Sequence, residues 1–337
     1  MLKFPGGKPS RTVRRATGLI VVPLLAAAAI AGCSSSPSSS SASAAASSNA
    51  NKSVSVSGAF GVSPTVKVPK VKAGSSLFTK TEIQGSGQAL TTSDSLIGNF
   101  VLYDWSGTSA KLVASTFKKS QGPTLFAGGQ MLPGLNAALV GQKAGSRVLA
   151  VVPPADGFGS SGNSQIGVKG TDTLVFVIDM QSVIPNSSSA TGKQVTNGGG
   201  SLPTVTEAAG KAATITMPTS TPPKSLSVTT LVKGTGPKVV SGDYVVVQYT
   251  GAIWRTGKVF DSSWSRNSLF AFSAGAGQVV KGWDTGLVGQ TVGSRVMLVI
   301  PPADGYGTAG ASQVGIKGTD TIVFSVDIVG SYTPTAG

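Results

Sequence analysis

The sequence predicts an α+β protein with two similar domains, each a curved antiparallel β-sheet wrapped around one short α-helix. The length of 337 residues allows two domains of roughly 100–150 residues. Blocks of the first half recur in the second half at an offset of 148 residues. Segments rich in Val, Ile and aromatic residues dominate each copy, whereas only one segment per copy has helical spacing. Together these observations favour a duplicated, strand-rich domain.

The chain begins with the features of a secretory signal peptide, to which we assign residues 1–32. Five basic residues precede an apolar run of about 12 residues, too short to cross a bilayer comfortably, which needs roughly 20. The run ends in Ile30-Ala31-Gly32-Cys33, which resembles a bacterial lipobox, whose cysteine is lipidated after cleavage. A transmembrane helix is the weaker interpretation. Arg14-Arg15 lacks the bulky residues expected after a twin-arginine pair, so we expect general secretion.

Cys33 is the only cysteine, and an ordinary signal peptide with an incidental thiol is the alternative interpretation. A lone thiol has no disulfide partner in an oxidising compartment, which counts against that alternative. We therefore predict lipidation at Cys33 and an extracytoplasmic protein anchored by lipid to the membrane of a bacterial cell envelope.

Two stretches of low complexity separate the parts of the mature chain. Residues 33–52 are almost entirely Ser and Ala, and residues 185–201 are rich in Ser and Gly. Such compositions bury too little apolar surface to offset the entropy of ordering, so both are predicted to be linkers. The predicted domains are residues 53–184 and 202–332.

The net charge of +14 falls to +9 once the five basic residues of the leader are removed. Basic residues are scattered singly rather than clustered with aromatic residues, so we expect no nucleic-acid partner. Attraction to anionic lipid or to a wall polymer suits an anchored protein better.

Within the second copy, residues 244–250, 295–300 and 321–329 are predicted strands. The last alternates cleanly, with Ile322, Phe324, Val326 and Ile328 on one face. The predicted helix covers residues 278–288, where Trp283 and Leu287 lie one turn apart and face the sheet.

From about residue 229 to 330, the second copy resembles the FKBP-type peptidyl-prolyl isomerases. The resemblance rests on five blocks that occur in the order and with the spacing of that family. They are Gln248-Tyr249-Thr250-Gly251, Gly257-Lys258-Val259-Phe260-Asp261-Ser262-Ser263, Val279-Val280-Lys281-Gly282-Trp283, Gly305-Tyr306-Gly307 and Val323-Phe324.

The resemblance implies one pocket between the helix and the concave face of the sheet. Its implied catalytic residues are Tyr249, Phe260, Asp261, Trp283, Tyr306 and Phe324. Its implied substrate-binding residues are Phe270, Val279, Val280, Ile316 and Arg266. Trp283 would form the floor, while the Val280 N–H and the Tyr306 hydroxyl would bond peptide carbonyls. Asp261 would be a polar anchor held by Arg266 and Tyr249.

X-Pro isomerisation suits residues of this kind because no covalent bond breaks. The barrier of about 20 kcal/mol is the amide resonance that is lost as the C–N bond twists. A twisted amide is less polar than a planar one, so an apolar pocket favours it. The chain has no histidine, and we expect neither a metal nor a cofactor.

Aromatic residues at this spacing are often simply core. A carboxylate within an aromatic cluster, Asp261 beside Phe260, needs a partner and favours the functional interpretation. Asp304 and Asp156 are predicted to be turn residues with Asx-type bonds. The segment 308–314 departs from the family pattern by an extra residue or two, which leaves substrate preference at that rim open.

The first copy has lost the polar anchors of this pocket. Alignment through the shared blocks sets Phe100 opposite Tyr249, Val113 opposite Phe260, Ala114 opposite Asp261, Leu135 opposite Trp283, and Phe158 opposite Tyr306. We therefore predict a degenerate domain with weak or no isomerase activity.

The sequence thus predicts a peptidyl-prolyl cis-trans isomerase that assists the folding of exported proteins, with catalysis in the second copy. Its expected partners are X-Pro-containing polypeptides and macrolide inhibitors. The alternative is a non-catalytic peptide-binding chaperone or adaptor lipoprotein, and a purely structural envelope lipoprotein is a weaker one.

Overall fold

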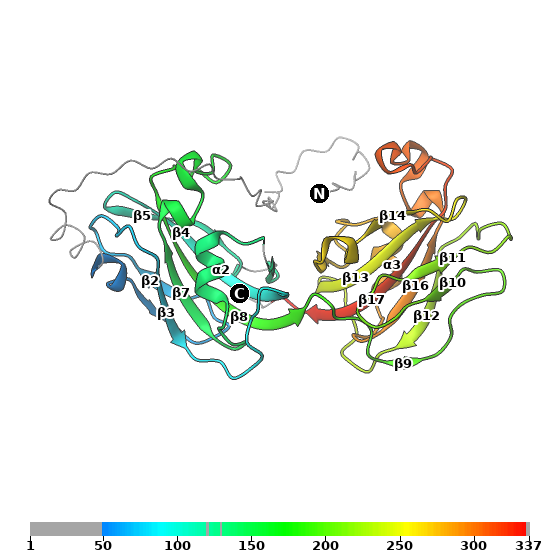
Figure 1. Cartoon of the computed structure of the whole chain (residues 1–337), viewed down its shortest axis with the longest axis horizontal. Helices are drawn as coiled ribbons and strands as arrows, with labels where there is room; N and C mark the ends of the chain where they lie inside the picture. Colours follow the sequence, from blue (N-terminus) through cyan, green and yellow to red (C-terminus); the bar gives the residue numbers. More distant parts are fainter. Residues whose placement is uncertain (1–48, 119–120, 129, 335–337) are drawn as a thin grey trace. The chain divides into compact units, whose positions relative to one another are not determined.

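A computed structural model describes residues 49–118, 121–128 and 130–334. These residues form two compact units, 49–184 and 185–334, each of which is described by itself (Figure 1). The predicted signal peptide and Cys33 lie outside the described residues. No helix in the described part of the chain is long and apolar enough to cross a membrane.

The first unit is a six-stranded sheet with strand order β3-β7-β8-β4-β5, in which β6 also pairs with β4. A separate two-stranded hairpin, β1–β2, precedes it. The elements are β1 (Ser55–Ser57), β2 (Thr65–Lys67), β3 (Phe78–Ile83), β4 (Asp94–Ser106), β5 (Ser109–Ser115), β6 (Thr124–Ala127), α2 (Pro133–Leu139), β7 (Arg147–Val152), the 3₁₀ turns η1 (Pro154–Asp156) and η2 (Gly159–Ser161), and β8 (Thr173–Pro185).

The second unit repeats this order as β12-β16-β17-β13-β14, with β15 on β13 and one further strand, β9, beside β12. Its own preceding hairpin is β10–β11. The elements are β9 (Lys193–Gln194), β10 (Thr204–Thr206), β11 (Thr214–Thr216), β12 (Ser227–Lys233), β13 (Tyr244–Ile253), β14 (Val259–Ser262), η3 (Trp264–Arg266), β15 (Phe270–Ser273), α3 (Lys281–Leu287), β16 (Arg295–Ile300), η4 (Pro302–Asp304), η5 (Gly307–Ala309), η6 (Ser312–Val314) and β17 (Ile322–Tyr332).

The fold class is as predicted, and the boundaries differ in places. Strand β16 covers the predicted 295–300, whereas β13 and β17 continue beyond their predicted ends. They do so because the two strands pair with each other over nearly their full length, from Tyr244↔Tyr332 to Ile253↔Ile322. The helix is shorter than 278–288, since Val280 and Val288 are both in extended conformation at its ends.

The core of the second unit lies between α3 and the concave face of the sheet. The alternating residues of β17, namely Ile322, Phe324, Val326 and Ile328, are all at most 1% exposed in this core, as predicted. Helix α3 lies close to β16 because it has glycine at the contact. A Cβ on Gly282 would lie only 2.7 Å from side-chain atoms of Ile300. Burial of each large apolar side chain here contributes about 1.5–3 kcal/mol.

The convex face of each sheet is covered by the hairpin that precedes it, and neither hairpin was predicted from the sequence. Val205 and Ile215 of β10–β11 are buried in one cluster with Ala252, Trp254 and Val323. In the first unit, Val56 and Val66 of β1–β2 pack on the equivalent cluster around Trp105. The repeated unit therefore begins before the first block that the sequence comparison recognised.

An arginine joins each hairpin to its sheet. Arg147 of the first unit binds both carboxylate oxygens of Asp179 at 2.6 and 2.7 Å, and it also donates to the hairpin carbonyls of Gly58 and Val62. Arg295 of the second unit binds Asp327 at 2.6 and 2.8 Å and lies 2.6 Å from the carboxyl of Glu207 in the hairpin.

The predicted linkers need correction where the structure describes them. Residues 185–201 fold against the second unit: β9 pairs with β12, and the Thr191 and Gly192 N–H groups donate to the Gly293 carbonyl at 3.0 Å. A Cβ on Gly192 would lie 2.0 Å from the Lys233 oxygen, so this glycine permits close packing rather than flexibility. The end of the 33–52 stretch is also folded, since Asn51 is buried and bonds Gly74 and Ser76.

Candidate active site

The second unit brings the residues of the predicted pocket together on the concave side of its sheet. Tyr249, Val279, Val280, Trp283, Ile316 and Phe324 are buried in one cluster, and Phe260, Phe270 and Tyr306 pack against it. Asp261 and Arg266 join the cluster through hydrogen bonds to Tyr249. All eleven predicted positions therefore belong to one region of the fold.

Trp283 lies at the centre of this region, on the face of α3 that packs on the sheet. Its ring centroid is 5.1 Å from that of Phe324 and 5.3 Å from that of Tyr249, both nearly perpendicular. Edge-to-face pairs of this kind add about 0.5–1.5 kcal/mol each beyond area burial and fix the orientation of the indole. A narrow apolar hollow opens here, lined by Phe270, Val279, Val280, Trp283 and Phe324. It offers an aromatic floor and aliphatic walls.

A β-bulge explains how Phe260 and Asp261 both reach the pocket. Gly251 pairs with Asp261 and Ala252 pairs with Val259, so Phe260 is the extra residue of β14. A bulge of this kind turns two successive side chains to one side of the sheet. Val259 and Ser262 consequently take the opposite face, where both line a second hollow.

Three side chains form a hydrogen-bonded network at the pocket wall. The Tyr249 hydroxyl donates to Asp261 Oδ2 at 2.5 Å, and Arg266 Nη2 donates to the same hydroxyl at 2.8 Å. Arg266 Nη1 also pairs with Asp261 Oδ1. Burial, followed by the charge of Asp261, raises the pKa of Tyr249, so its phenol stays protonated. The network keeps a negative charge beside an otherwise apolar pocket, which costs less because the charge is paired.

Tyr306 stands at the start of η5, on the segment that connects β16 to β17. Burial and the charge of Asp261 raise the pKa of its hydroxyl as well. The phenol is therefore neutral at physiological pH and keeps its O–H group. Its ring lies 6.5 Å from that of Phe260, nearly perpendicular to it.

Two ion pairs hold the segment that carries Tyr306 and Ile316, and sequence reasoning missed both. Lys281 Nζ at the start of α3 lies 2.7 Å from Asp304 Oδ1. Arg255, just after β13, binds Asp320 through Nε at 2.8 Å and Nη2 at 3.0 Å. Asp304 was predicted to make an Asx-type bond, whereas its carboxylate pairs with Lys281. The partners are far apart in the sequence, so no local pattern indicates them.

The first unit has the same backbone frame at the bulge, in the helix and at the turn after the strand that follows the helix. Leu102 pairs with Ala114 and Tyr103 with Leu112, so Val113 is the extra residue of an identical bulge. Leu135 lies in α2 at the position of Trp283, and Phe158 begins η2 as Tyr306 begins η5. The structure thus supports the alignment, and it sets apolar residues where the second unit has Tyr249, Asp261, Trp283 and Tyr306.

Comparison with known proteins shows the family of both units. The family model of FKBP-type peptidyl-prolyl cis-trans isomerases matches residues 92–181 and 236–329, which together exceed half of the chain. An FK506-binding protein of Streptomyces anulatus is 39% identical over 115 residues, which is 34% of this chain and 93% of that protein. FK506-binding protein 2B of Rhizopus delemar is 52% identical over 89 residues, 26% of this chain and 42% of that protein.

Two further proteins are similar to a third or less of this chain. The peptidyl-prolyl cis-trans isomerase FPR2 of Saccharomyces cerevisiae is 46% identical over 92 residues, 27% of this chain and 67% of that protein. The structure of FkpA from Escherichia coli is 33% identical and covers 33% of this chain and 49% of FkpA, with a TM-score of 0.30. The assignment rests on the family model and on sequence identity rather than on that score. The chain belongs to the FKBP-type peptidyl-prolyl cis-trans isomerase family and has two domains of that family in tandem.

Proposed function

We propose that the second domain catalyses peptidyl-prolyl cis-trans isomerisation in its concave aromatic pocket, and that it acts on exported proteins as they fold. The observation that carries the proposal is the Tyr249–Asp261–Arg266 network beside the aromatic hollow around Trp283. This combination would offer an apolar surface to a proline ring and a polar wall to the peptide.

The geometry suits a reaction that needs no proton transfer. A proline ring against the Trp283 indole would leave the X-Pro amide in surroundings of low polarity, which favour the less polar twisted form. The Val280 N–H, at the start of α3, and the neutral Tyr306 hydroxyl are the donors proposed for the flanking carbonyls. Donors fixed in advance stabilise the twisted form without reorganising during the reaction. Asp261 keeps Tyr249 and Arg266 in place.

The direct test is an isomerisation assay on an X-Pro tetrapeptide with the full chain and its Trp283→Leu variant. Leucine is the residue that the first domain has at this position. We expect the wild-type chain to accelerate isomerisation and the variant to lose at least about tenfold in kcat/KM, because the floor of the pocket is removed. A wild-type rate equal to the uncatalysed rate would contradict the proposal and favour a non-catalytic peptide-binding chaperone or adaptor.

Several relatives carry the name FK506-binding protein, and we propose that the second domain binds macrolides of that class in the same pocket. Quenching of Trp283 fluorescence would report such binding, measured against the background of Trp254, Trp264 and Trp105. An unchanged signal in the wild-type chain at saturating macrolide would contradict it.

We also propose that the protein is anchored to the bacterial cell envelope by lipid on Cys33, after cleavage of residues 1–32. The support is the basic and apolar leader followed by Ile30-Ala31-Gly32-Cys33. Incorporation of labelled palmitate by the wild-type chain and its loss in Cys33→Ala is the expected result. Equal labelling of both chains would contradict the anchor.

A further inference from the structure

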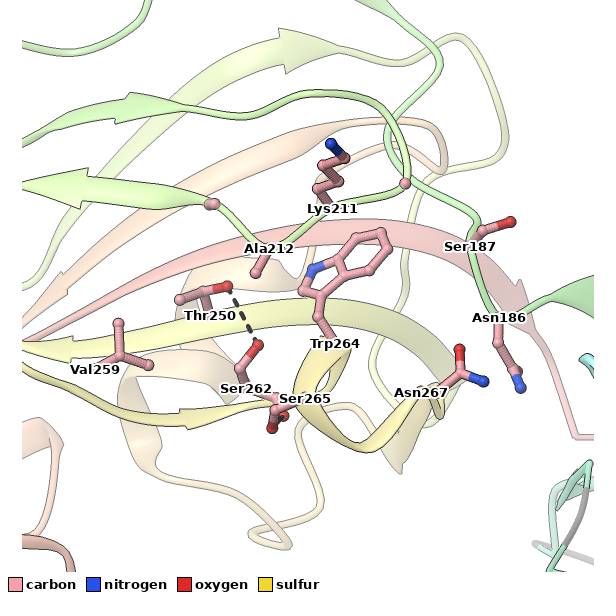
Figure 2. A pocket seen from close by; sticks show the side chains of 12 residues that line it. Asn186, Ser187, Lys211, Ala212, Thr250, Val259, Ser262, Trp264, Ser265 and Asn267 are labelled. Atoms are coloured by element: carbon pink, nitrogen blue, oxygen red, sulfur yellow. Dashed lines mark hydrogen bonds between the residues drawn. The ribbon is translucent and has the colours of Figure 1, made fainter.

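A second hollow lies on the convex side of the second domain, outside the proposed catalytic pocket. It has a volume of about 470 Å³ and opens between residues 210–213 of the covering hairpin and the strands β13 and β14 (Figure 2). Figure 2 shows the Trp264 side chain between the loop that carries Lys211 and Ala212 and the strands that carry Thr250 and Ser262. The hollow therefore has an aromatic wall and a floor with hydroxyl groups.

The hollow and the catalytic pocket share one strand. Phe260 and Asp261 of β14 face the concave pocket because of the bulge, whereas Val259 and Ser262 of the same strand line the convex hollow. Trp264 follows in η3, three residues after Asp261. A polypeptide that leaves the concave pocket across β14 would arrive at this hollow.

Strand β14 is the outermost strand of the sheet on this side. Its residue Val259 is 47% exposed. Edge strands can pair with an added extended chain, in which main-chain hydrogen bonds provide affinity and neighbouring pockets select side chains. An edge strand beside an aromatic hollow has both parts of this recognition mode.

The charge of the hollow restricts its occupant. Lys211 is exposed and is the one charged residue among those that line the hollow. No carboxylate in the lining balances it. An extended segment with an acidic residue near Lys211 and an apolar residue against Trp264 would complement the surface.

At the equivalent positions that the structure describes, the first domain has apolar residues. Phe117, at the position of Trp264, is only 8% exposed and packs in an apolar cluster with Val101 and Trp105. Val62, at the position of Lys211, has its carbonyl bound by Arg147 at 2.7 Å. The second domain has Trp264, Lys211 and Thr250 where the first has, in the same order, Phe117, Val62 and Val101. Each change makes the surface more suitable for a polar, extended ligand.

We propose that the Trp264 hollow binds an extended, acidic segment of the same unfolded polypeptide whose X-Pro bond occupies the concave pocket. The segment adds to the edge of β14 and contacts Trp264 with an apolar side chain. This inference rests on the proposed isomerase function and defines its substrate as a long unfolded chain rather than a short peptide. The hollow raises affinity without taking part in the twisting of the amide.

The test uses the full chain with Val259→Asp and Trp264→Phe, and with Val240→Asp as the matched control. Val240 is 49% exposed, close to Val259, and lies outside the hollow. Two substrates are compared: an X-Pro tetrapeptide, and a reduced, carboxymethylated protein chain with net negative charge. Fluorescence anisotropy gives the Kd of the labelled chain, and the tetrapeptide assay gives kcat/KM.

We expect Val259→Asp to weaken binding of the long chain at least about fivefold and Trp264→Phe to weaken it about twofold. Tetrapeptide kcat/KM should stay within twofold of the wild-type value, and Val240→Asp should change neither quantity. The proposal is wrong if long-chain affinity is unchanged in Val259→Asp, or if tetrapeptide activity falls in parallel with it. The proposal is also wrong if Val259→Asp weakens binding to vesicles of anionic lipid and leaves binding of the protein chain unchanged. A wild-type chain without tetrapeptide activity would contradict the isomerase function, while the anisotropy measurement would still decide the role of the hollow.

Discussion

At the bulge of the outermost strand, the first domain has Val113 and Ala114 where the second has Phe260 and Asp261. The backbone frames around these residues are alike. The likeness extends to the start of β7 and β16, where a serine hydroxyl accepts from a glycine N–H in both domains, at 2.8 Å for Ser146 and 2.9 Å for Ser294. The contacts that build the sheet were therefore retained, while the polar groups of the pocket were not.

The ion pairs around the pocket also differ between the two domains. Asp156 and Asp172 of the first domain correspond to Asp304 and Asp320, but their partners are replaced by Pro133 and Ser106. The backbone bonds of the acids persist, since the Lys169 N–H donates to Asp172 and the Lys317 N–H donates to Asp320, both at 2.8 Å. The carboxylate that caps this turn is therefore common to both domains. Cations that hold the Tyr306 segment are present only where the pocket is complete.

The largest expected effect concerns the arginines that hold the hairpins of both domains. Arg147→Met should lower the free energy of unfolding of the first domain by about 3–5 kcal/mol, because Asp179 is left as an unpaired buried charge. Arg295→Met should lower the free energy of unfolding of the second domain by less, because the Arg295 side chain is 11% exposed whereas the Arg147 side chain is 1% exposed. Hydrogen exchange followed by mass spectrometry resolves the opening free energy of each domain separately. Equal losses in both domains would contradict this ranking.

A second difference between the domains concerns pH. Burial and the charge of Asp327 raise the pKa of Glu207 from 4.5 to about 8, whereas the first domain has Gly58 at that place. Between these values the folded state binds more protons than the unfolded state, so the free energy of unfolding falls as pH rises. We expect the stability of the second domain to decrease from about pH 5 to pH 8, and Glu207→Gln to remove most of that slope.

Urea unfolding followed by tryptophan fluorescence measures this effect, since three of the four tryptophans belong to the second domain. The wild-type chain and Glu207→Gln are compared at each pH, so that other titrating groups cancel. Identical pH slopes for the two chains would show that Glu207 is ionised in the folded state.

Much of the second domain could be predicted from its sequence because its signals are local. The alternation of apolar and polar residues predicted the last strand, and five sequence blocks in the order of the family indicated the pocket residues from Tyr249 to Phe324. The hairpins were missed because their strands have three residues each and are rich in Thr and Ser. A repeat of Thr65-Val66-Lys67-Val68-Pro69 as Thr214-Ile215-Thr216-Met217-Pro218 was the available signal. Residues 185–201 were predicted to be a linker from their composition. Composition does not indicate that a strand within them, β9, pairs with β12.

The smallest expected effect concerns the ion pair between Arg255 and Asp320. Arg255→Ser gives the second domain the residue that the first has, and should lower tetrapeptide kcat/KM about two- to fivefold, mainly through KM. The physical reason is a less well-held segment around Ile316. Lys258→Ser, an exposed change in the same turn, serves as the control. A loss of stability without a change in KM would assign Arg255 to folding alone.

The central claim is that catalysis belongs to the second domain and not to the first. The most direct measurement compares tetrapeptide isomerisation by two full-length double variants at equivalent positions, Trp283→Leu/Tyr306→Ala and Leu135→Ala/Phe158→Ala. The account predicts the uncatalysed rate for the former and at least half of the wild-type kcat/KM for the latter. Activity that survives in the former and disappears in the latter would show that the first domain is the catalyst.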